Sequence, residues 1–228
     1  MKVTLCVGGA ILAPEEVNVE VIRKIVDAVE AMVKAGHQVN IVVGGGVIAR
    51  KYIQKAREIG VPQAEQDKIG IAATRLNAQL LISALGKLAA PDVITTAEAA
   101  ISASARGLVP VMGGVSPGQT TDAVAAFLAA QSGSDILVFV TDVDGIYTED
   151  PKKNPSAQKI DKMTTEELVR KFGSEKMTPG MHTVVDPLAS RLIHQYRVNT
   201  IVIGEKDLDN LLDILRGGKH SGTTILPV

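Results

Sequence analysis

The chain has 228 residues, of which 46% are apolar and 21% charged, and its 24 Lys and Arg nearly balance 25 Asp and Glu. At roughly 150 residues per domain, this length predicts one large or two small domains with a sizeable core. The net charge of −1, with 3% aromatic residues and no Trp, argues against a nucleic-acid partner, because such binding needs a basic surface and stacking side chains.

The single cysteine, Cys6, excludes an intrachain disulfide and a thiolate metal cluster. Its isolation favours a reducing compartment, and we expect the cytoplasm. The apolar run 3–13 contains two glycines, lacks an Ala-x-Ala site at its end and leads into an acidic segment, so we do not interpret it as a signal peptide. The clean apolar stretches fall well short of the roughly 18 residues that indicate a membrane span, so we expect no membrane partner.

Short β-branched runs alternate with segments of helical period along the first half of the chain. Strands are expected at 3–7 and 39–43, with a helix over about 22–33 between them. A second helix, over about 48–59, ends at Gly60, and a longer helix follows over about 67–85. The expected inner face of that long helix consists of Ile69, Ala72, Ala73, Leu76, Leu80 and Ala84.

The alternation continues to the end of the chain. Expected strands are 93–95, 109–112, 136–140, 200–203 and 223–225, and expected helices are 97–105, 122–130, 165–172, 187–196 and 208–215. A polar stretch, 148–162, interrupts the pattern. We therefore predict one domain over 1–228, an α/β fold built as a three-layer α/β/α sandwich with a mainly parallel central sheet. Its two halves, about 1–132 and about 133–228, would meet along the carboxyl ends of the strands.

Glycine-rich turns follow four of the expected strands, at Gly8-Gly9, Gly44-Gly45-Gly46, Gly113-Gly114 and Gly145. We expect all four at one sheet edge, where their N–H groups and the following helix N-termini favour phosphate binding. The alternative is that the glycines only form tight turns. The chain has no P-loop motif, and Ala49 stands where the dinucleotide-binding fingerprint needs its third glycine, so a Rossmann dehydrogenase is a distant alternative.

Several aspartates lie beside these turns and are candidates for chemistry. Asp67 is expected at a helix start, Asp122 follows two threonines, and Asp150 precedes Pro151. Each could equally serve as a helix cap or a turn former. The four histidines show no metal-ligand spacing, no Ser-His-Asp grouping is apparent, and the spacing identifies no metal ligands.

Three groups of motifs together resemble a known family. The first group is Gly8-Gly9-Ala10-Ile11-Leu12 and Val42-Val43-Gly44-Gly45-Gly46 with Ala49-Arg50. The second is Asp67-x-x-Gly70-x-x-x-Thr74-x-x-Asn77-Ala78. The third is Pro117-Gly118-Gln119-Thr120-Thr121-Asp122, with Thr141-Asp142-Val143-Asp144-Gly145-Ile146-Tyr147. In this order the motifs resemble the amino acid kinase superfamily, most closely its archaeal uridylate kinases, from Met1 to about Ile225.

The resemblance implies phosphoryl transfer from ATP to UMP with Mg²⁺, in pyrimidine nucleotide biosynthesis. The half over about 1–132 would bind UMP and the half over about 133–228 would bind ATP. The implied ATP-binding residues are Gly9, Ala10, Gly46, Arg50, Thr141, Tyr147 and Asp150. The implied UMP-binding residues are Gly45, Asp67, Val115, Ser116, Pro117, Gly118, Gln119, Thr120 and Thr121. The family's usual hexamer implies a homo-oligomer.

The chain departs from the family where lysines are common. Two positions that hold Lys in many relatives have none here, and Asp142 stands at the second. Arg50 is our first candidate for the cation at the transferring phosphoryl group and Lys51 the second, with Asp122 as an orienting carboxylate. Two alternatives stay open: another small-molecule kinase of the superfamily, for carbamate, an acylglutamate or isopentenyl phosphate, and a non-catalytic member that binds nucleotides or other anions.

Overall fold

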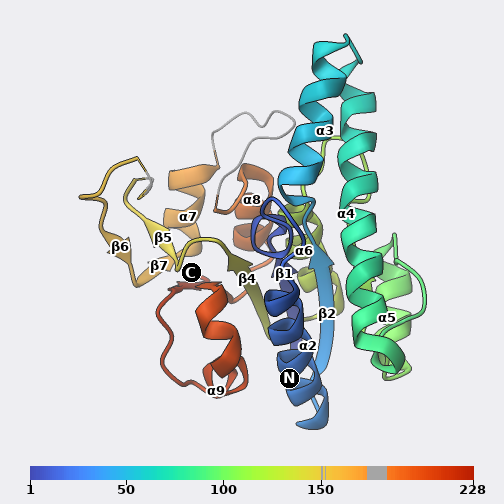
Figure 1. Cartoon of the computed structure of the whole chain (residues 1–228). Helices are drawn as coiled ribbons and strands as arrows, with labels where there is room; N and C mark the ends of the chain where they lie inside the picture. Colours follow the sequence, from blue (N-terminus) through green and yellow to red (C-terminus); the bar gives the residue numbers. More distant parts are fainter. Residues whose placement is uncertain (150, 152, 174–183) are drawn as a thin grey trace.

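A seven-stranded sheet forms the centre of the molecule, in the order β3-β2-β1-β4-β8-β9-β7 (Figure 1). The computed structural model describes residues 1–149, 151, 153–173 and 184–228. The strands of this sheet are β1 (Lys2–Val7), β2 (Gln38–Val43), β3 (Val111–Met112), β4 (Ile136–Thr141), β7 (Lys162–Thr164), β8 (Thr200–Gly204) and β9 (Thr223–Leu226). A separate hairpin pairs β5 (Ile146–Tyr147) with β6 (Lys159–Ile160).

The strands β3, β2, β1, β4 and β8 run parallel to one another, which confirms the mainly parallel sheet. Strand β9 is antiparallel to β8 and parallel to β7. The register pairs Val7, at the end of β1, with Val43 of β2 and Val140 of β4. The loops that follow these three strands therefore emerge at one level of the same sheet edge.

Alternation of side chains along each strand divides the core into two layers. Val3, Leu5 and Val7 of β1 belong to one apolar cluster, and Cys6 belongs to the other. The first cluster lies against α2 (Val19–Lys34), the end of α4 (Gln63–Leu85) and α9 (Leu211–Leu215). The second lies against α5 (Ala97–Ala105), α6 (Thr121–Ser132), α7 (Thr165–Phe172) and α8 (Pro187–Gln195). This arrangement confirms the three-layer α/β/α sandwich.

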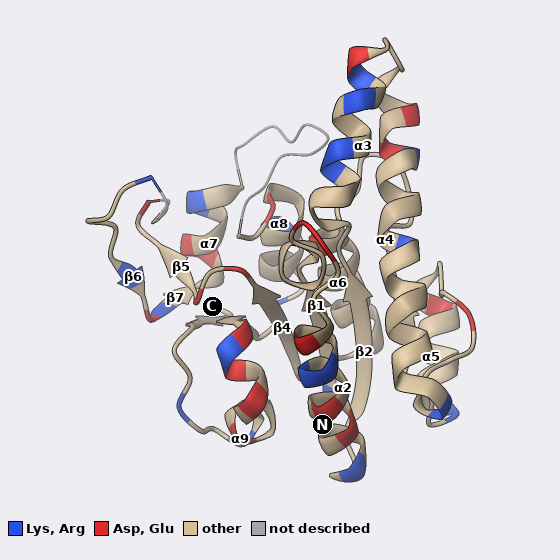
Figure 2. Ribbon diagram, in the orientation of Figure 1, with Lys and Arg blue, Asp and Glu red and all other residues tan. Residues whose placement is uncertain are grey.

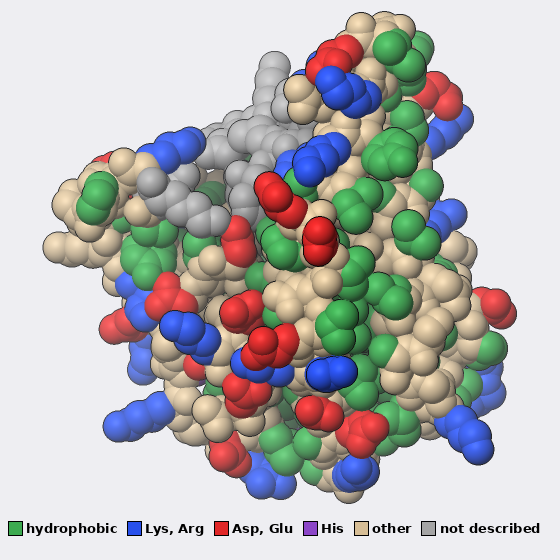
Figure 3. Space-filling view, in the orientation of Figure 1, with side chains coloured by type: hydrophobic (Ala, Val, Ile, Leu, Met, Phe, Trp, Pro, Cys, Tyr) green, Lys and Arg blue, Asp and Glu red, His purple; other side chains and the backbone are tan. Residues whose placement is uncertain are grey.

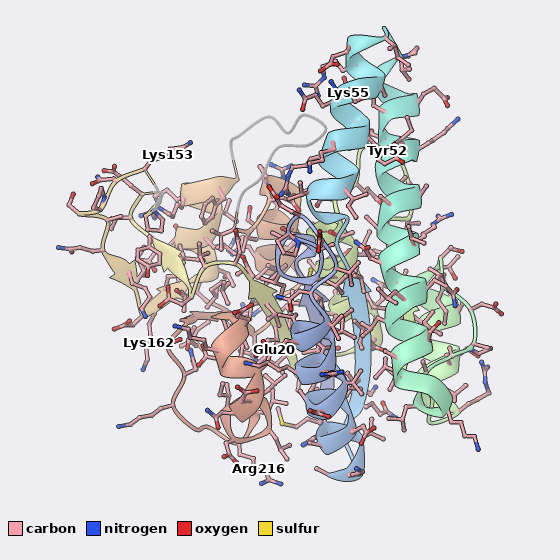
Figure 4. All side chains as sticks on the ribbon, in the orientation of Figure 1. Glu20, Tyr52, Lys55, Lys153, Lys162 and Arg216 are labelled. Atoms are coloured by element: carbon pink, nitrogen blue, oxygen red, sulfur yellow. The ribbon has the colours of Figure 1, made fainter. Side chains whose placement is uncertain are left out.

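Helices α3 (Gly46–Glu58) and α4 form an antiparallel hairpin that projects beyond the carboxyl edge of the sheet (Figure 1). Lys55 lies toward the tip of the hairpin and Tyr52 about one turn closer to the sheet (Figure 4). The helix over Gln63–Leu88 is the one helix in the described chain with the length and composition to cross a membrane, and a third of its apolar window is buried in the fold.

The prediction for the inner face of α4 is wrong. The helix buries Thr74, Asn77, Ala78, Leu81, Ile82 and Leu85, whereas Leu76 is 66% exposed, and Ala72, Leu80 and Ala84 are also exposed. Between Ile69 and Leu85 the helix carries apolar or small residues on every side, so helical period cannot select one face. Packing against the sheet selects it instead.

Three further expectations need correction. Residues 93–95 form no strand and contribute only an isolated bridge from Ile94 to Met112. The polar stretch 148–162 contains β6 and reaches the start of β7, because short hairpin strands lack the apolar runs that mark buried strands. The helix expected over 208–215 is divided into a 3-10 helix, Glu205–Asn210, and the short helix α9.

Candidate active site

A cleft of about 270 Å³ opens at the carboxyl edge of the sheet, between the loops after β1, β2 and β3 and the α3–α4 hairpin. Of the residues we expected to bind ligand, it is lined by Gly9, Ala10, Gly45, Gly46, Arg50, Asp67, Gly118, Gln119, Thr120, Thr121, Asp122 and Thr141. Val115, Ser116, Pro117 and Tyr147 are not part of this lining, and Asp150 lies outside the described residues. The structure therefore brings most of the expected site together.

Three of the four glycine turns converge on the cleft, and the fourth does not. Gly145 is packed against Thr223, whose hydroxyl accepts a hydrogen bond from the Ile146 N–H at 2.7 Å. This position belongs to the start of the β5–β6 hairpin. Gly145 follows Thr141, the last residue of β4, by four residues and is not itself part of the cleft lining, so its contribution to phosphate binding stays a prediction.

The glycines after β1 and β2 are required by a direct contact between two backbones. A Cβ atom on Gly9 would lie 2.0 Å from the Gly46 nitrogen, and one on Gly44 would lie 2.6 Å from the Gly9 nitrogen. Gly46 also has a φ of +67°, which side-chain-bearing residues rarely adopt. The tight-packing explanation thus accounts for these glycines by itself, whether or not their N–H groups hold a phosphate.

The cation expected at the cleft is present. Arg50 is the fifth residue of α3, is half-buried and lines the cleft, and no described residue forms an ion pair with it. Lys51 is exposed and is not part of the lining. Because α3 begins at Gly46, both its N-terminus and the Arg50 guanidinium present positive charge to the same cleft.

Asp67 lies inside α4, not at its start. The helix begins at Gln63, so the capping role considered for Asp67 is wrong. Its carboxylate accepts a hydrogen bond at 2.9 Å from the N–H of Gly118, which is 51 residues away in the loop between β3 and α6. The other carboxylate oxygen accepts no hydrogen bond from the described residues, which leaves it available to a ligand in the cleft.

The capping role considered for Asp122 is also wrong, because Thr120 caps α6. The Thr120 hydroxyl accepts from the Ala123 N–H at 3.1 Å, and Asp122 is the second residue of the helix. Asp122 lines the cleft, and its Oδ1 lies 3.6 Å from the Cys6 sulfur. Burial raises the pKa of the Cys6 thiol well above its ordinary value, and Asp122 adds to that rise. Cys6 therefore stays a neutral thiol at pH 7 and is no nucleophile.

Asp186 is a cleft residue that sequence reasoning missed. It is 1% exposed and caps α8, where its Oδ1 accepts from the N–H groups of Leu188 at 2.7 Å and Ala189 at 3.0 Å. Its Oδ2 accepts a hydrogen bond from the Thr120 hydroxyl, which connects the starts of α6 and α8. The signal available in the sequence was an Asp before Pro187, a common start of a helix.

The residues expected around adenine and ribose are only partly at the cleft. Thr141, at the end of β4, is buried and lines it. Tyr147 lies in β5 and donates its hydroxyl to Asp144 at 2.6 Å, while the Lys159 ammonium lies 3.2 Å from the same carboxylate. Partial burial acts to raise the pKa of Asp144, but the bonds from Tyr147 and Lys159 hold it below its ordinary value. The bond to Asp144 raises the pKa of Tyr147.

Comparison with known proteins places this geometry in a family. Residues 1–204 match the family model described as the amino acid kinase family. The chain is 44% identical to a uridylate kinase of Thermococcus kodakarensis over 228 residues and to one of Pyrococcus abyssi over 227, with all of each chain covered. The crystal structure of uridylate kinase from Archaeoglobus fulgidus superposes with a TM-score of 0.85 at 40% identity, covering 99% of this chain and 100% of that one.

The contact between the two glycine loops predicts a large effect of one methyl group. Gly9→Ala should lower the free energy of unfolding by about 1–3 kcal/mol, because the new Cβ meets backbone that cannot rotate away. Gly70→Ala is the matched control, since its Cβ at 3.0 Å meets only the flexible end of Ile53 and alanine favours the helix. Urea unfolding of both variants measures the difference. Equal midpoints would show that the loops are not held in this contact.

Proposed function

The chain belongs to the amino acid kinase family and to its uridylate kinase branch, and we propose that it transfers the γ-phosphoryl group of ATP to UMP, giving ADP and UDP. The observation that carries the proposal is the cleft itself, where two glycine loops, the start of α3 and Arg50 face the carboxylate of Asp67. Relatives named uridylate kinase at 44% identity over the full chain support the same acceptor. The reaction belongs to pyrimidine nucleotide biosynthesis.

The chemistry of the acceptor explains why the site needs no general base. A phosphate monoester has a second pKa of about 6, so at pH 7 its attacking oxygen is already an anion. The enzyme has to align two anions and stabilise the charge that moves between them. Arg50 supplies positive charge at this position, and the backbone N–H groups at Gly9, Ala10 and Gly46 are the ATP-side donors we propose.

Magnesium fits this site as a companion of the ATP phosphates. Within the described residues no group of three or more His, Cys, Asp or Glu could hold a metal ion. Mg²⁺ is commonly held by one or two carboxylates together with substrate phosphates, and Asp122 is a carboxylate on the cleft wall. Bound there, the ion would neutralise phosphate charge, while Asp122 would hold and orient it.

We assign the half over about 1–132 to UMP and the half over about 133–228 to ATP. On the acceptor side, Gly45 and the loop over 115–121, of which residues 118–121 line the cleft, would surround the nucleotide, and the second oxygen of Asp67 would accept from a ribose hydroxyl. On the ATP side, Thr141 and Tyr147 contact the adenosine. Because the Tyr147 hydroxyl is bonded to Asp144, its ring rather than its hydroxyl would meet the adenine. Asp150 would accept hydrogen bonds from the ribose hydroxyls of ATP.

We further propose a cytoplasmic homo-oligomer, a hexamer by the family's usual state. Tyr52 of α3 and Leu76 and Leu80 of α4 are 65%, 66% and 39% exposed, and Figure 3 shows exposed hydrophobic side chains along the α3–α4 hairpin. Exposed apolar side chains that share one surface are typical of subunit interfaces. A second copy of the chain packed on the hairpin would bury them.

The acceptor assignment is tested with a panel of phosphoryl acceptors. With Mg·ATP, UMP should give the highest kcat/KM in a set of UMP, CMP, dUMP, AMP, acetylglutamate, carbamate and isopentenyl phosphate, followed by release of ADP. The reason is that Asp67 accepts from ribose hydroxyls while the loop over 115–121 supplies donors to a pyrimidine. Faster turnover of CMP or isopentenyl phosphate than of UMP would contradict the assignment. Equal release of ADP with no acceptor present would contradict it as well.

Asp67→Asn tests binding of the acceptor independently of binding of ATP. The amide keeps the size of the side chain but removes the charged acceptor, so the KM for UMP should rise about tenfold with little change in the KM for ATP. Glu65→Gln is the control, because Glu65 is exposed and pairs with Lys68 at 2.7 Å. Steady-state kinetics with each substrate varied gives the answer, and a change in melting temperature alone would assign Asp67 a purely structural role.

Arg50→Ala tests the cation at the transferring phosphoryl group. We expect kcat to fall about 100-fold at saturating Mg·ATP with UMP binding nearly intact, since the interaction is strongest when charge moves between the phosphates. Arg50→Lys should recover only part, because an ammonium cannot hold two oxygens as a guanidinium does. Lys51→Ala, one residue further on and exposed, should leave kcat unchanged. Wild-type kcat in Arg50→Ala would refute the role.

Leu76→Glu tests the assembly. If a second copy covers α4, a carboxylate at this position should dissociate the oligomer, because it places an unpaired charge in an apolar interface. Leu226→Glu, at a site of 47% exposure on β9, is the control and should keep the wild-type mass. Sedimentation velocity measures the mass of the assembly that each variant forms. A monomeric wild type, or equal behaviour of the two variants, would exclude this surface as the interface.

A further inference from the structure

The loop between β3 and α6, residues 113–120, is held by side chains from α4. Thr74 accepts from the Gly114 N–H at 2.6 Å, and Asp67 accepts from the Gly118 N–H at 2.9 Å. Arg75 donates from Nε to the Gly114 carbonyl at 3.1 Å and from Nη2 to the Val115 carbonyl at 3.4 Å. Helix α4 therefore holds the loop at Gly114, Val115 and Gly118, while Thr120 at its end is bonded to Asp186 of α8.

Arg75 is the only charged residue in the last 17 residues of α4, 69–85. Figure 2 shows this part of the helix almost without charge. Its guanidinium is half-buried and forms no ion pair with any described residue, so its charge is directed entirely at two consecutive carbonyl groups. A planar guanidinium that bonds two carbonyls at once fixes the orientation of both peptide planes, which a flexible ammonium cannot do.

The orientation of these two peptides determines which backbone groups the loop presents on the side opposite Arg75, shortly before Gly118 and Gln119, which line the cleft. In a trans peptide the N–H points opposite to the C=O, so the N–H groups of Val115 and Ser116 point away from Arg75. The next carbonyl, that of Ser116, accepts from the Gln119 N–H at 3.2 Å. Neither the Val115 nor the Ser116 N–H has an acceptor among the described residues. Between Gly114 and Ser116 the loop thus has its carbonyls occupied and two consecutive N–H donors left over.

We propose that Arg75 is a positioning residue for acceptor selection: it holds the Gly114 and Val115 carbonyls away from the base and leaves the Val115 and Ser116 N–H groups as donors to a pyrimidine carbonyl. This inference rests on the proposed function. Uracil presents a carbonyl oxygen at C4, which accepts from an N–H. Cytosine presents an amino group there, which would place donor against donor. The loop therefore favours uracil because Arg75 occupies the acceptors with which cytosine could bond.

The kinetic test compares Arg75→Met and Arg75→Lys with Arg106→Met. Arg106 is exposed, and among the described residues its side chain bonds only the Ser102 hydroxyl, at 2.9 Å, so its variant controls for the loss of an arginine. Arg75→Met should raise the KM for UMP about tenfold and lower the ratio of kcat/KM for UMP to that for CMP by a similar factor. The KM for ATP should stay within about twofold of wild type. Arg75→Lys should give a KM for UMP and a selectivity ratio between those of Arg75→Met and wild type.

A second measurement does not depend on the identity of the acceptor. In the free enzyme, amide hydrogen exchange at Gly114 and Gly118 should become about tenfold faster in Arg75→Met, with peptides of the β1–β4 sheet unchanged. Exchange equal to wild type, or an equal rise in the KM for ATP and UMP, would overturn the proposal. If the loop loosens but the wild type prefers another acceptor, Arg75 still positions the loop and the proposed function itself fails.

Discussion

The backbone contact between the loops after β1 and β2 sets the position of the whole cleft. Gly9 and Gly46 approach so closely that neither has room for a side chain. This contact is possible because β1 and β2 are paired in register and end at the same level, with Val7 beside Val43. Helix α3 begins at Gly46, so the same contact decides where its N-terminus points and where Arg50, one turn later, lies.

Helix α4 is the second element on which the site depends, and it acts through side chains. Asp67, Thr74 and Arg75 each bond the backbone of the loop over 113–120. Farther along, Asn77 donates to the Gly44 carbonyl at 2.9 Å, which connects α4 to the loop after β2 as well. One face of the helix packs into the core and another faces outward, so a single element joins the sheet, two cleft loops and an exposed apolar surface.

The electrostatics of the cleft suit a transfer between two phosphates. Arg50 and the starts of α3 and α6 provide positive charge, and the carboxylate residues Asp122 and Asp186 line the same cleft. Asp186 is stabilised in its buried position by two backbone N–H groups and the Thr120 hydroxyl. Because Thr120 caps α6, this carboxylate couples the loop that we assign to UMP with a helix of the ATP half.

Local sequence predicted most of the secondary structure. The strands β1, β2, β4 and β8 are mostly apolar and buried at consecutive positions, since a parallel strand is buried on both faces, and turns and caps marked most helix ends. Strands of two or three residues, such as β5, β6 and β7, were missed, because so few residues show no period. The motifs indicated the correct family, and most of the residues implied by the resemblance line one cleft.

The sequence by itself determined the alternation of strands and helices, the parallel sheet, the edge where three glycine loops meet and the family. Only the tertiary structure decided which face of α4 is buried, that Asp67 bonds Gly118, that Asp186 reaches Thr120 and that Arg75 holds two carbonyls. The physical reason is separation along the chain. Propensity and period act over a few residues, whereas these contacts join residues 39 to 66 positions apart and form only when the sheet brings their elements together.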